Sequence, residues 1–365
     1  VQIRCFGEGM RKVFGNLTLN GKKHDSGMSS FQALATAIAA QVGTGNIVGA
    51  SGAILTGGPG AIFWMWVIAF FGMATIYAEA TLAIETRQKD PDGSYRGGPV
   101  YYITTAFKGG FGKFLAGFFA VAIILALGFM GCMVQSNSIG ECFQTAFGIP
   151  SWIVGVALVI ICGIIFLGGV QRLAAVTEKI VPIMAAIFLL GGLVILIFRI
   201  RYVPATFGMI FKYAFEPQAI VGGSFGYAIK QAISQGAKRG LFSNEAGMGS
   251  TPHAHALAKV KRPQDQGEIA IVSVFIDTFV VLTLTAMVIL TSGMLNPGAP
   301  DGLQGTELAQ AAFSASLGTI GGAFVAICML FFAFSTIIGW YFFGEQNVKA
   351  LFGHKAVKAY AAIVV

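Results

Sequence analysis

The chain has 365 residues, of which 55% are hydrophobic and only 11% are charged, and its formal net charge is +8. A soluble globular domain has about 25% charged residues, so this chain has too little polar surface to cover a water-soluble particle. Together with a mean hydropathy of +0.74, the composition excludes an ordinary soluble protein and indicates a protein buried in a membrane.

Long apolar stretches follow one another along the chain, and most have the roughly 20 residues that a membrane-spanning helix needs. They cover residues 31–56, 60–84, 114–139, 151–170, 173–198, 219–260, 268–293 and 317–343, and a further stretch begins near residue 356. Many of the 49 glycines lie inside these stretches, where small residues let membrane helices approach closely. The sequence therefore predicts an all-α polytopic membrane protein.

The basic residues indicate an orientation, because short cytoplasmic loops are enriched in lysine and arginine. With the N-terminus placed inside, the outer segments carry only Arg199, Arg201, Lys212 and Lys230. The inner segments carry Arg4, Arg11, Lys12, Lys22, Lys23, Arg87, Lys89, Arg96, Lys108, Lys113, Arg172, Lys179, Lys259, Lys261, Arg262, Lys349, Lys355 and Lys358. This asymmetry accounts for the positive net charge without a nucleic-acid partner.

The first stretch contains Gly43-Thr44-Gly45-Asn46, a poor sequence for the middle of a helix. Glycine costs about 1 kcal/mol relative to alanine in a helix interior, and backbone groups freed in hydrocarbon must find partners or face a water-filled cavity. We therefore predict an unwound segment near the bilayer midplane. Its N–H groups suit a carboxylate, and its carbonyls suit a cation. The alternative is a close-packed glycine face without a ligand.

The sixth stretch contains a second interruption, GLFSNEAGMGSTP at residues 240–252. Its proline can occupy the first turn of a new helix, so we favour a second break followed by a short inner half-helix over residues 251–258. One alternative is a cytoplasmic loop, because basic residues lie on both sides of the string. Another is an earlier break at Gly222-Gly223-Ser224.

Breaks in the first and the sixth stretch suggest an internal repeat, because paired broken helices in corresponding positions indicate a transporter built from inverted repeats. We interpret residues 1–365 as one transmembrane transporter domain. The first repeat covers residues 31–198, and the second, inverted and incomplete, covers residues 219–365. The final apolar run at 359–365 is too short to cross a bilayer, so we expect terminal helices to be missing from this sequence.

Other polar residues lie inside the spans. Thr336 and Trp340 share a helix face, which fits a small-solute pocket, although both residue types also have routine structural roles in membranes. Gln135 reaches either a cavity or a neighbouring helix. Glu79 and Asp277 are intramembrane carboxylates and hence functional candidates, but for both we favour ion pairs with loop cations.

Enzymatic chemistry finds little support in the residues. The five cysteines are scattered without a CxxC pair, so neither a disulfide framework nor a zinc site is predicted. No catalytic triad, Walker loop or nucleotide fingerprint appears. We expect no enzyme and no cofactor. A channel is the alternative to a carrier, but a channel usually needs a continuous polar pore or rings of charge.

Three strings make a family recognisable: VGTGNIVGA at 42–50, GGPVYYI at 97–103 and GLFSNEAGMGSTP at 240–252, supported by QSNS at 135–138 and FAFSTIIGW at 332–340. By these strings the chain resembles the alanine/glycine:cation symporters, also called sodium:alanine symporters. The resemblance implies a LeuT-type helical bundle of two inverted repeats with discontinuous first and sixth core helices. It also implies uptake of small neutral amino acids with sodium, or less often protons, by alternating access in the bacterial inner membrane.

The first string is also similar to that of the neurotransmitter:sodium symporters, which implies roles for single residues. The substrate carboxylate would meet the amides near Thr44 and Gly45. One sodium would lie near Asn46 and the Gln41 carbonyl. A second sodium would lie among Ala39, Val42, Ser335 and Thr336. The other residues implied for the substrate site are Asn46, Gln135, Phe242, Ser243, Asn244, Gly247, Thr336 and Trp340.

Overall fold

The structure is a computed structural model that describes residues 1–15, 28–89, 95–216, 225–295, 302–303 and 305–365. Within these residues the protein is almost entirely helical. The described strands form one antiparallel hairpin of β1 (Gln88–Lys89) and β2 (Tyr95–Arg96). An all-helical architecture is therefore confirmed.

The helices of the first half are α1 (Phe6–Phe14), α2 (Ser30–Gln41), the π-helix η1 (Gly45–Gly49), α3 (Ala50–Gly57), α4 (Gly60–Glu85), α5 (Pro99–Ala106), α6 (Gly109–Ile123), the π-helix η2 (Ile124–Gly131), α7 (Cys132–Phe147), α8 (Ser151–Phe166) and α9 (Gly169–Phe198). Those of the second half are the 3-10 helix η3 (Ile200–Tyr202), α10 (Val203–Phe215), α11 (Phe225–Asn244), α12 (Pro252–His255), α13 (Pro263–Val274), the π-helix η4 (Phe275–Leu282), α14 (Thr283–Thr291), α15 (Gly305–Leu317), α16 (Thr319–Phe352) and α17 (Ala356–Val364).

Several helices are suited to cross a membrane. In the described part of the chain, 5 continuous helices are long and apolar enough, and they cover residues 60–85, 109–147, 169–198, 263–291 and 319–352. A sixth candidate is the pair 30–41 and 45–57, whose two parts are inclined by 47° at a short break. These segments coincide with predicted apolar stretches, so the prediction of a multi-pass membrane protein is confirmed.

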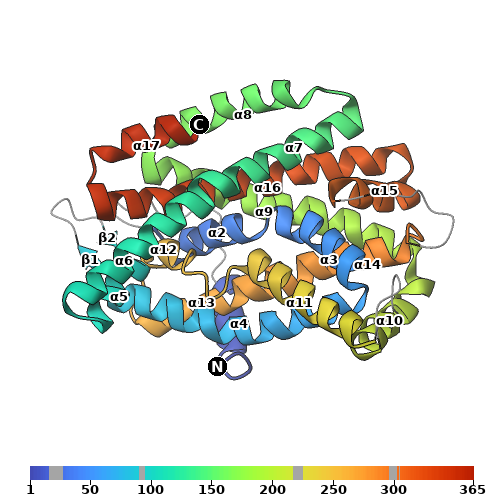
Figure 1. The fold of residues 1–365 in the computed structure, drawn as a ribbon, viewed down its shortest axis with the longest axis horizontal. Helices are drawn as coiled ribbons and strands as arrows, with labels where there is room; N and C mark the ends of the chain where they lie inside the picture. Colours follow the sequence, from blue (N-terminus) through green and yellow to red (C-terminus); the bar gives the residue numbers. More distant parts are fainter. Residues whose placement is uncertain (16–27, 90–94, 217–224, 296–301, 304) are drawn as a thin grey trace.

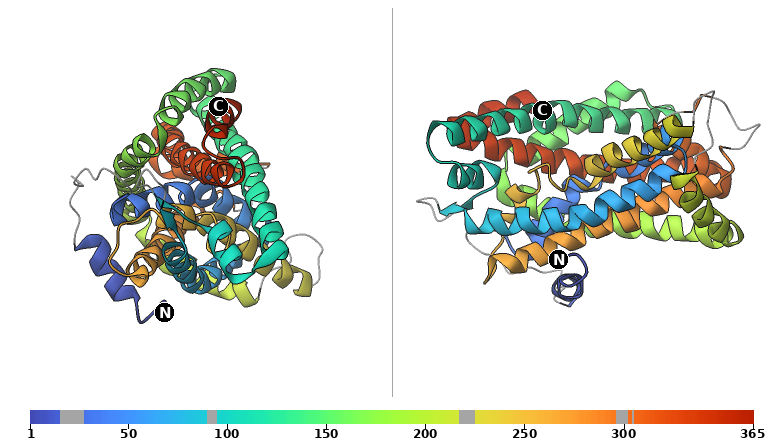
Figure 2. Two further views of the ribbon diagram at one scale, coloured as in Figure 1. Left: turned by 90° about the vertical axis from the view of Figure 1, so that its left-hand side faces the viewer. Right: turned by 60° about the horizontal axis from the view of Figure 1, so that its bottom comes forward.

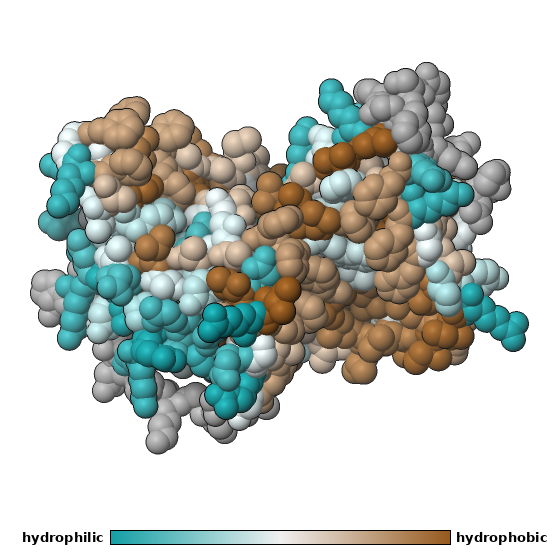
Figure 3. All heavy atoms as spheres, turned by 90° about the horizontal axis from the view of Figure 1, so that it is seen from below, coloured by the Kyte–Doolittle hydropathy of each residue, from teal (hydrophilic) through white to brown (hydrophobic). Residues whose placement is uncertain are grey.

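The long helices lie side by side along one axis of the molecule (Figure 1). One end carries α5 and the hairpin, and the other carries α10 and α15; we call them the α5 end and the α15 end. Seen from the α5 end, α8 and α17 form one outer edge of the bundle and α1 lies at the opposite edge (Figure 2). On the face seen from below, hydrophilic residues gather toward the α5 end, and apolar side chains cover much of the rest (Figure 3).

Helix α2 lies in the interior, and every residue from Ala33 to Gln41 is buried. Its small side chains let α16 approach very closely: a Cβ on Gly339 would lie only 2.8 Å from the Cβ of Ala40. In the same way, a Cβ on Gly236 of α11 would lie 2.5 Å from the carbonyl oxygen of Ala61 in α4. Glycine and alanine thus set the helix spacing that brings polar groups of α2, α11 and α16 together.

The proposed division into repeats at 31–198 and 219–365 stays a prediction. The boundary at residue 219 and the alternative break at Gly222-Gly223-Ser224 lie outside the described residues.

Candidate functional site

The first predicted break is present between α2 and η1. Helix α2 ends at Gln41, and Val42 has extended backbone angles of φ −81° and ψ 92°. The freed groups find side-chain partners: Gly43 N–H donates to Asn46 Oδ1 at 2.9 Å, and Thr44 N–H donates to Gln135 Oε1 at 3.1 Å. Gly43 has no room for a side chain, because a Cβ would lie 2.3 Å from the hydroxyl oxygen of Thr336. The sequence GTGN therefore produces an unwound, polar segment inside the bundle.

The second predicted break is also present, between α11 and α12. Glu245 takes a positive φ of 56°. Gly247 and Gly249 take φ values of 89° and 73°, which glycine adopts without a Cβ penalty. Pro252 then begins the short helix α12. Because Glu245, Ser250 and Thr251 are fully buried, an exposed cytoplasmic loop does not describe this segment.

Glu79 of α4 anchors this second break. Its carboxylate accepts the backbone N–H groups of Gly247 and Gly249, each at 3.0 Å. The expected ion pair with a loop cation is not found among the described residues. A carboxylate that accepts hydrogen bonds from two freed N–H groups acts as a capping group does at the end of a helix. Gly247 lies against α4, where a Cβ on it would be 3.5 Å from Cγ2 of Thr75, and its place in a pocket with Trp340 stays a prediction.

The two breaks lie next to each other. Gln41 Nε2 donates to the main-chain carbonyl of Asn244 at 2.7 Å. A Cβ on Gly45 would lie 3.0 Å from the Cα of Ser243, so the two backbones approach closely. The ends of two half-helices that are some 200 residues apart in sequence thus share one polar interior.

Asp277, in the π-helix η4, lies at the junction of the two breaks and is fully buried. Its carboxylate accepts from Asn46 Nδ2 at 2.7 Å, from the Ser243 hydroxyl at 3.0 and 3.1 Å, and from the Thr278 hydroxyl at 2.8 Å. All of these donors are neutral. No described ion pair involves Asp277, so the loop-cation partner that we expected is absent from the described residues. A buried carboxylate with neutral partners is suited to hold a cation.

A second group of oxygen atoms lies between α2 and α16. The Ser335 hydroxyl is 3.3 Å from the Ala39 carbonyl oxygen, and the Thr336 hydroxyl is 3.0 Å from that oxygen and 3.4 Å from the Val42 carbonyl oxygen. The predicted group of Ala39, Val42, Ser335 and Thr336 is therefore close together. Two carbonyls and two hydroxyls form an oxygen-only set of the kind that hard cations prefer.

Trp340 forms one wall of the interior near the second break. Its ring lies edge-on to Phe242 with centroids 5.9 Å apart, and its indole N–H donates to Glu245 Oε1. The other oxygen of Glu245 accepts from the Ser250 hydroxyl at 2.5 Å. Gly131 makes room for the indole, because a Cβ there would lie 2.4 Å from the ring. Phe242 itself is exposed over 39% of its surface.

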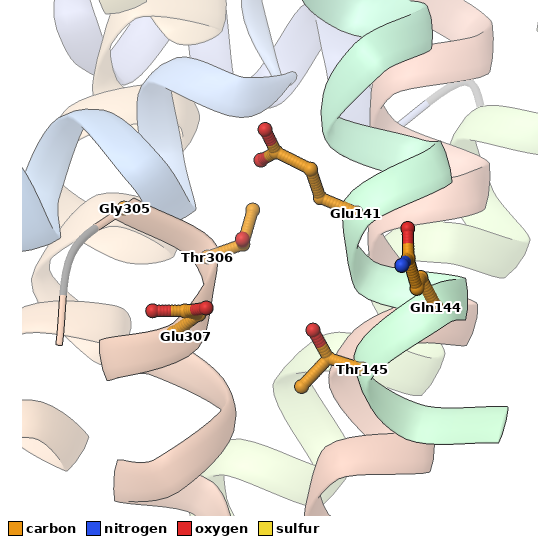
Figure 4. A pocket seen from close by; sticks show the side chains of 6 residues that line it. All are labelled: Glu141, Gln144, Thr145, Gly305, Thr306 and Glu307. Atoms are coloured by element: carbon orange, nitrogen blue, oxygen red, sulfur yellow. The ribbon is translucent and has the colours of Figure 1, made fainter. Parts of the chain in front are cut away.

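A cavity of about 520 Å³ opens at the α15 end and is lined by Glu141, Gln144, Thr145, Gly305, Thr306 and Glu307. Its lining side chains come from α7 and α15 on either side (Figure 4). None was singled out in the sequence, because the two helices are far apart along the chain. The cavity adjoins the first broken helix, since a Cβ on Gly305 would lie 3.4 Å from Cγ1 of Val48.

At the α5 end, several hydrogen bonds hold α12 to its neighbours. Met28, which precedes α2, pairs with the strand-like residues 257–259 through two backbone hydrogen bonds of 3.0 Å. Arg87 donates to the carbonyls of Ala256 and Ala258 at 3.0 and 2.6 Å. His253 Nε2 lies 2.9 Å from Asn347 Nδ2 of α16. These contacts join α2, α12, α16 and the end of α4.

Sequence reasoning missed the roles of Asp277, Glu245 and Glu79 in this interior. A usable signal existed for each, because a carboxylate inside an apolar stretch is costly without a function. We assigned Asn244 to the substrate. Its side-chain Nδ2 donates to the Thr278 hydroxyl at 3.3 Å, and its Oδ1 accepts from the Ala246 N–H at 3.1 Å. Within the described residues, no three His, Cys, Asp or Glu side chains are grouped as a metal site.

Comparisons with known proteins agree with this picture. A sequence profile of the sodium:alanine symporter family matches residues 1–365. The sodium/alanine symporter AgcS of Methanococcus maripaludis is 45% identical over 335 residues, which are 91% of this chain and 73% of that protein. The amino-acid carrier protein AlsT of Bacillus subtilis is 41% identical over 349 residues, covering 96% and 71% of the two chains.

Among solved structures, a crystal structure of the Eremococcus coleocola manganese transporter superposes with a TM-score of 0.60 over 92% of this chain and 68% of that one. At 14% sequence identity, this likeness concerns the fold alone. The family profile and the relatives above confirm the resemblance drawn from the sequence motifs. The chain belongs to the sodium:alanine symporter family.

Proposed function

We propose that the protein is a secondary active symporter that takes up small neutral amino acids, alanine and glycine, together with sodium. The observation that carries this proposal is the contact between the two helix breaks through Gln41 and Asn244. Two half-helix ends that meet inside an apolar bundle supply both N–H groups for an anion and carbonyls for a cation, as transporters with broken helices require. The printed names of AgcS and AlsT, a sodium/alanine symporter and an amino-acid carrier, support the same substrate class.

The substrate carboxylate would bind at the first break, where the N–H groups of Gly43 and Thr44 are held by side-chain acceptors next to the N-terminus of η1. Thr44 N–H now donates to Gln135 Oε1 at 3.1 Å, so a neutral acceptor holds the place that suits an anion. Gln135 would then pair with the substrate by a small rotation of its side chain. The absence of a side chain on Gly45 lets the backbone at Ser243 approach the first break, since a Cβ on Gly45 would lie 3.0 Å from the Cα of Ser243.

The coupling ion would occupy two places. One lies near Asn46, the Gln41 carbonyl and Asp277, whose buried negative charge has only neutral donors. The other lies among Ala39, Val42, Ser335 and Thr336, whose oxygen atoms are 3.0 to 3.4 Å apart across α2 and α16. Protons remain the second choice of coupling ion that the family resemblance implies.

Trp340 and Phe242 would limit the size of the substrate side chain. Trp340 is held on three sides, by Gly131, by Phe242 and by its bond to Glu245. An indole held in this way would leave room only for small side chains such as those of glycine and alanine. Size discrimination of this kind is worth about 1–3 kcal/mol per methylene.

Alternating access would use the two ends of the bundle. Hydrogen bonds of Met28, Arg87 and His253 hold α12 to its neighbours at the α5 end, and a cavity lies at the α15 end. With the α5 end inside, as the basic residues predict, this arrangement is the one that receives substrate from outside. The repeats proposed for residues 31–198 and 219–365, in a LeuT-type arrangement, would rock against each other to open the α5 end.

The proposal is tested by uptake into proteoliposomes that contain the purified protein. We expect radiolabelled alanine to accumulate when an inward sodium gradient is imposed and to remain near background when potassium replaces sodium. Alanine flux that does not depend on the sodium gradient would contradict a carrier mechanism, and so would single-channel currents through the same preparation.

A further inference from the structure

Glu245 has an unusual backbone conformation for a residue that directly follows a helix. It follows the last residue of α11 and has a φ of 56°, the only positive φ of a non-glycine residue in the described chain. This region costs an L-residue about 1–2 kcal/mol, and glycine or asparagine would avoid most of that cost. Such strain is typical of residues whose side chain is needed at a site. The side chain of Glu245 is fully buried.

The two carboxylate oxygens of Glu245 have one donor each. Trp340 Nε1 donates to Oε1, and the Ser250 hydroxyl donates to Oε2 at 2.5 Å. A carboxylate has about four acceptor positions, so positions on both oxygens are left. Asp277, in contrast, already accepts from Asn46, Ser243 and Thr278.

Both donors of Glu245 are neutral, and no described ion pair includes this residue. Neutral donors orient a buried carboxylate but do not balance its charge, and an unbalanced buried charge is costly. A cationic group that arrives with the ligand would remove that cost. This need exists only when the carboxylate is ionised, and no ion pair within the described part of the chain meets it.

The position of Glu245 suits the amino end of an amino acid. Thr336 and Trp340 lie on one face of α16: the Thr336 hydroxyl is beside Gly43 at the first break, and the Trp340 indole is beside Glu245 at the second. A ligand along this face would have amide donors at one end and a carboxylate at the other. Those ends match the carboxylate and the ammonium of a zwitterion.

We infer that Glu245 binds the ammonium group of the transported amino acid and thereby restricts the site to ligands with a charged amino group. The inference rests on the proposed function and deepens it: acids of the same size and shape that carry a hydroxyl in place of the ammonium are rejected because Glu245 is then left unpaired.

The test compares binding of radiolabelled alanine in the presence of sodium to the purified protein, with unlabelled alanine and lactate as competitors. Lactate has the carbon skeleton of alanine with a hydroxyl in place of the ammonium. For the unaltered protein we expect lactate to compete at least about 100-fold more weakly than alanine, since a site that leaves a buried polar group unpaired rejects the analogue strongly. Lactate that competes within about threefold of alanine overturns the inference without any variant.

Glu245→Gln removes the charge but keeps an acceptor for Trp340, and we expect it to weaken alanine binding by about tenfold or more. Ser250→Ala is the matched control, because it keeps the charge and removes one hydrogen bond; we expect a clearly smaller loss. Equal losses in the two variants, or a Glu245→Gln protein that binds alanine like the unaltered one, would show that Glu245 has a structural role only. Sodium-dependent thermal stabilisation of each variant serves as the check of folding.

The two proposals fail in different ways. If the unaltered protein binds no small neutral amino acid in sodium, the proposed function fails. If it binds alanine and does not discriminate against lactate, the proposed function stands and the role of Glu245 fails.

Discussion

The side-chain amide of Gln41 donates a 2.7 Å hydrogen bond to the main-chain carbonyl of Asn244. Gln41 is the last residue of α2, and Asn244 is the last residue of α11, so one hydrogen bond joins the ends of two half-helices beside their breaks. Both residues are buried, and the carbonyl freed at the end of α11 thereby has a partner. Gln41 thus has a structural role besides the ion-binding role expected of its own carbonyl.

Gln41→Leu should loosen the contact between the two breaks. The substitution leaves the Asn244 carbonyl buried without a donor, which costs about 1–3 kcal/mol, so we expect a lower unfolding temperature and slower alanine uptake. Thermal unfolding in detergent and uptake into proteoliposomes measure the two effects. Thr86→Val, at the exposed end of α4, is the control, and a Gln41→Leu protein that behaves like this control would contradict the role of Gln41.

Asp277→Asn should impair the use of sodium. The asparagine keeps the size of the side chain and part of its hydrogen bonding with Ser243 and Thr278, but it removes the buried negative charge. Because interactions with a charged group contribute about 1.5–3 kcal/mol, we expect the sodium concentration for half-maximal uptake to rise by about tenfold or more. Thr285→Val, two turns further along the same helix, should leave sodium activation near that of the unaltered protein. An unchanged sodium curve for Asp277→Asn would remove this carboxylate from the ion site.

Asn46→Ala should weaken the sodium dependence of uptake while the protein still inserts into the membrane. Asn46 Oδ1 holds the Gly43 N–H at 2.9 Å, and its amide donates to Asp277, so the alanine variant loses both the ordering of the break and one ligand of the proposed ion. The sodium curve of uptake is compared with the amount of protein in the membrane fraction. Reduced membrane content with a normal sodium curve would point to a folding role instead.

Trp340→Ala should enlarge the accepted substrate. Removing the indole opens the space beside Phe242 and Gly131, so we expect leucine or phenylalanine to compete with alanine. Trp152, on α8 with 71% of its surface exposed, is the matched control, and Trp152→Ala should keep the original selectivity. Unaltered competition profiles for Trp340→Ala would remove Trp340 from the pocket.

Glu79→Gln should loosen the second break itself. A glutamine side chain has one oxygen acceptor in place of two, so either the Gly247 or the Gly249 N–H loses its partner. We expect faster hydrogen exchange in residues 245–251, measured by mass spectrometry, with little change around the first break. Glu141→Gln, at the cavity between α7 and α15, removes a carboxylate that holds no described backbone N–H and should leave this exchange unaltered.

Much of the architecture followed from local sequence. The apolar stretches marked the spans because each of those segments must cover its backbone with hydrocarbon side chains, and both breaks were visible because glycine and polar residues interrupt helices. The GTGN segment carried part of the candidate site for the same reason, whereas the role of the Ser335-Thr336 pair was implied by the family resemblance. The strings at 42–50, 97–103 and 240–252 indicated the sodium:alanine symporter family.

The sequence by itself determined that the chain is a many-helix membrane protein with two broken helices and a family signature. Only the tertiary structure decided which polar groups meet. Glu79, Asp277 and Glu245 each looked like an isolated carboxylate in an apolar stretch, and for Glu79 and Asp277 a loop cation was a reasonable partner. Close packing of small residues instead brings them to backbone N–H groups, hydroxyls and an indole on other helices. Such partners lie tens to hundreds of residues away, and their distances depend on how closely glycine and alanine let the helices approach.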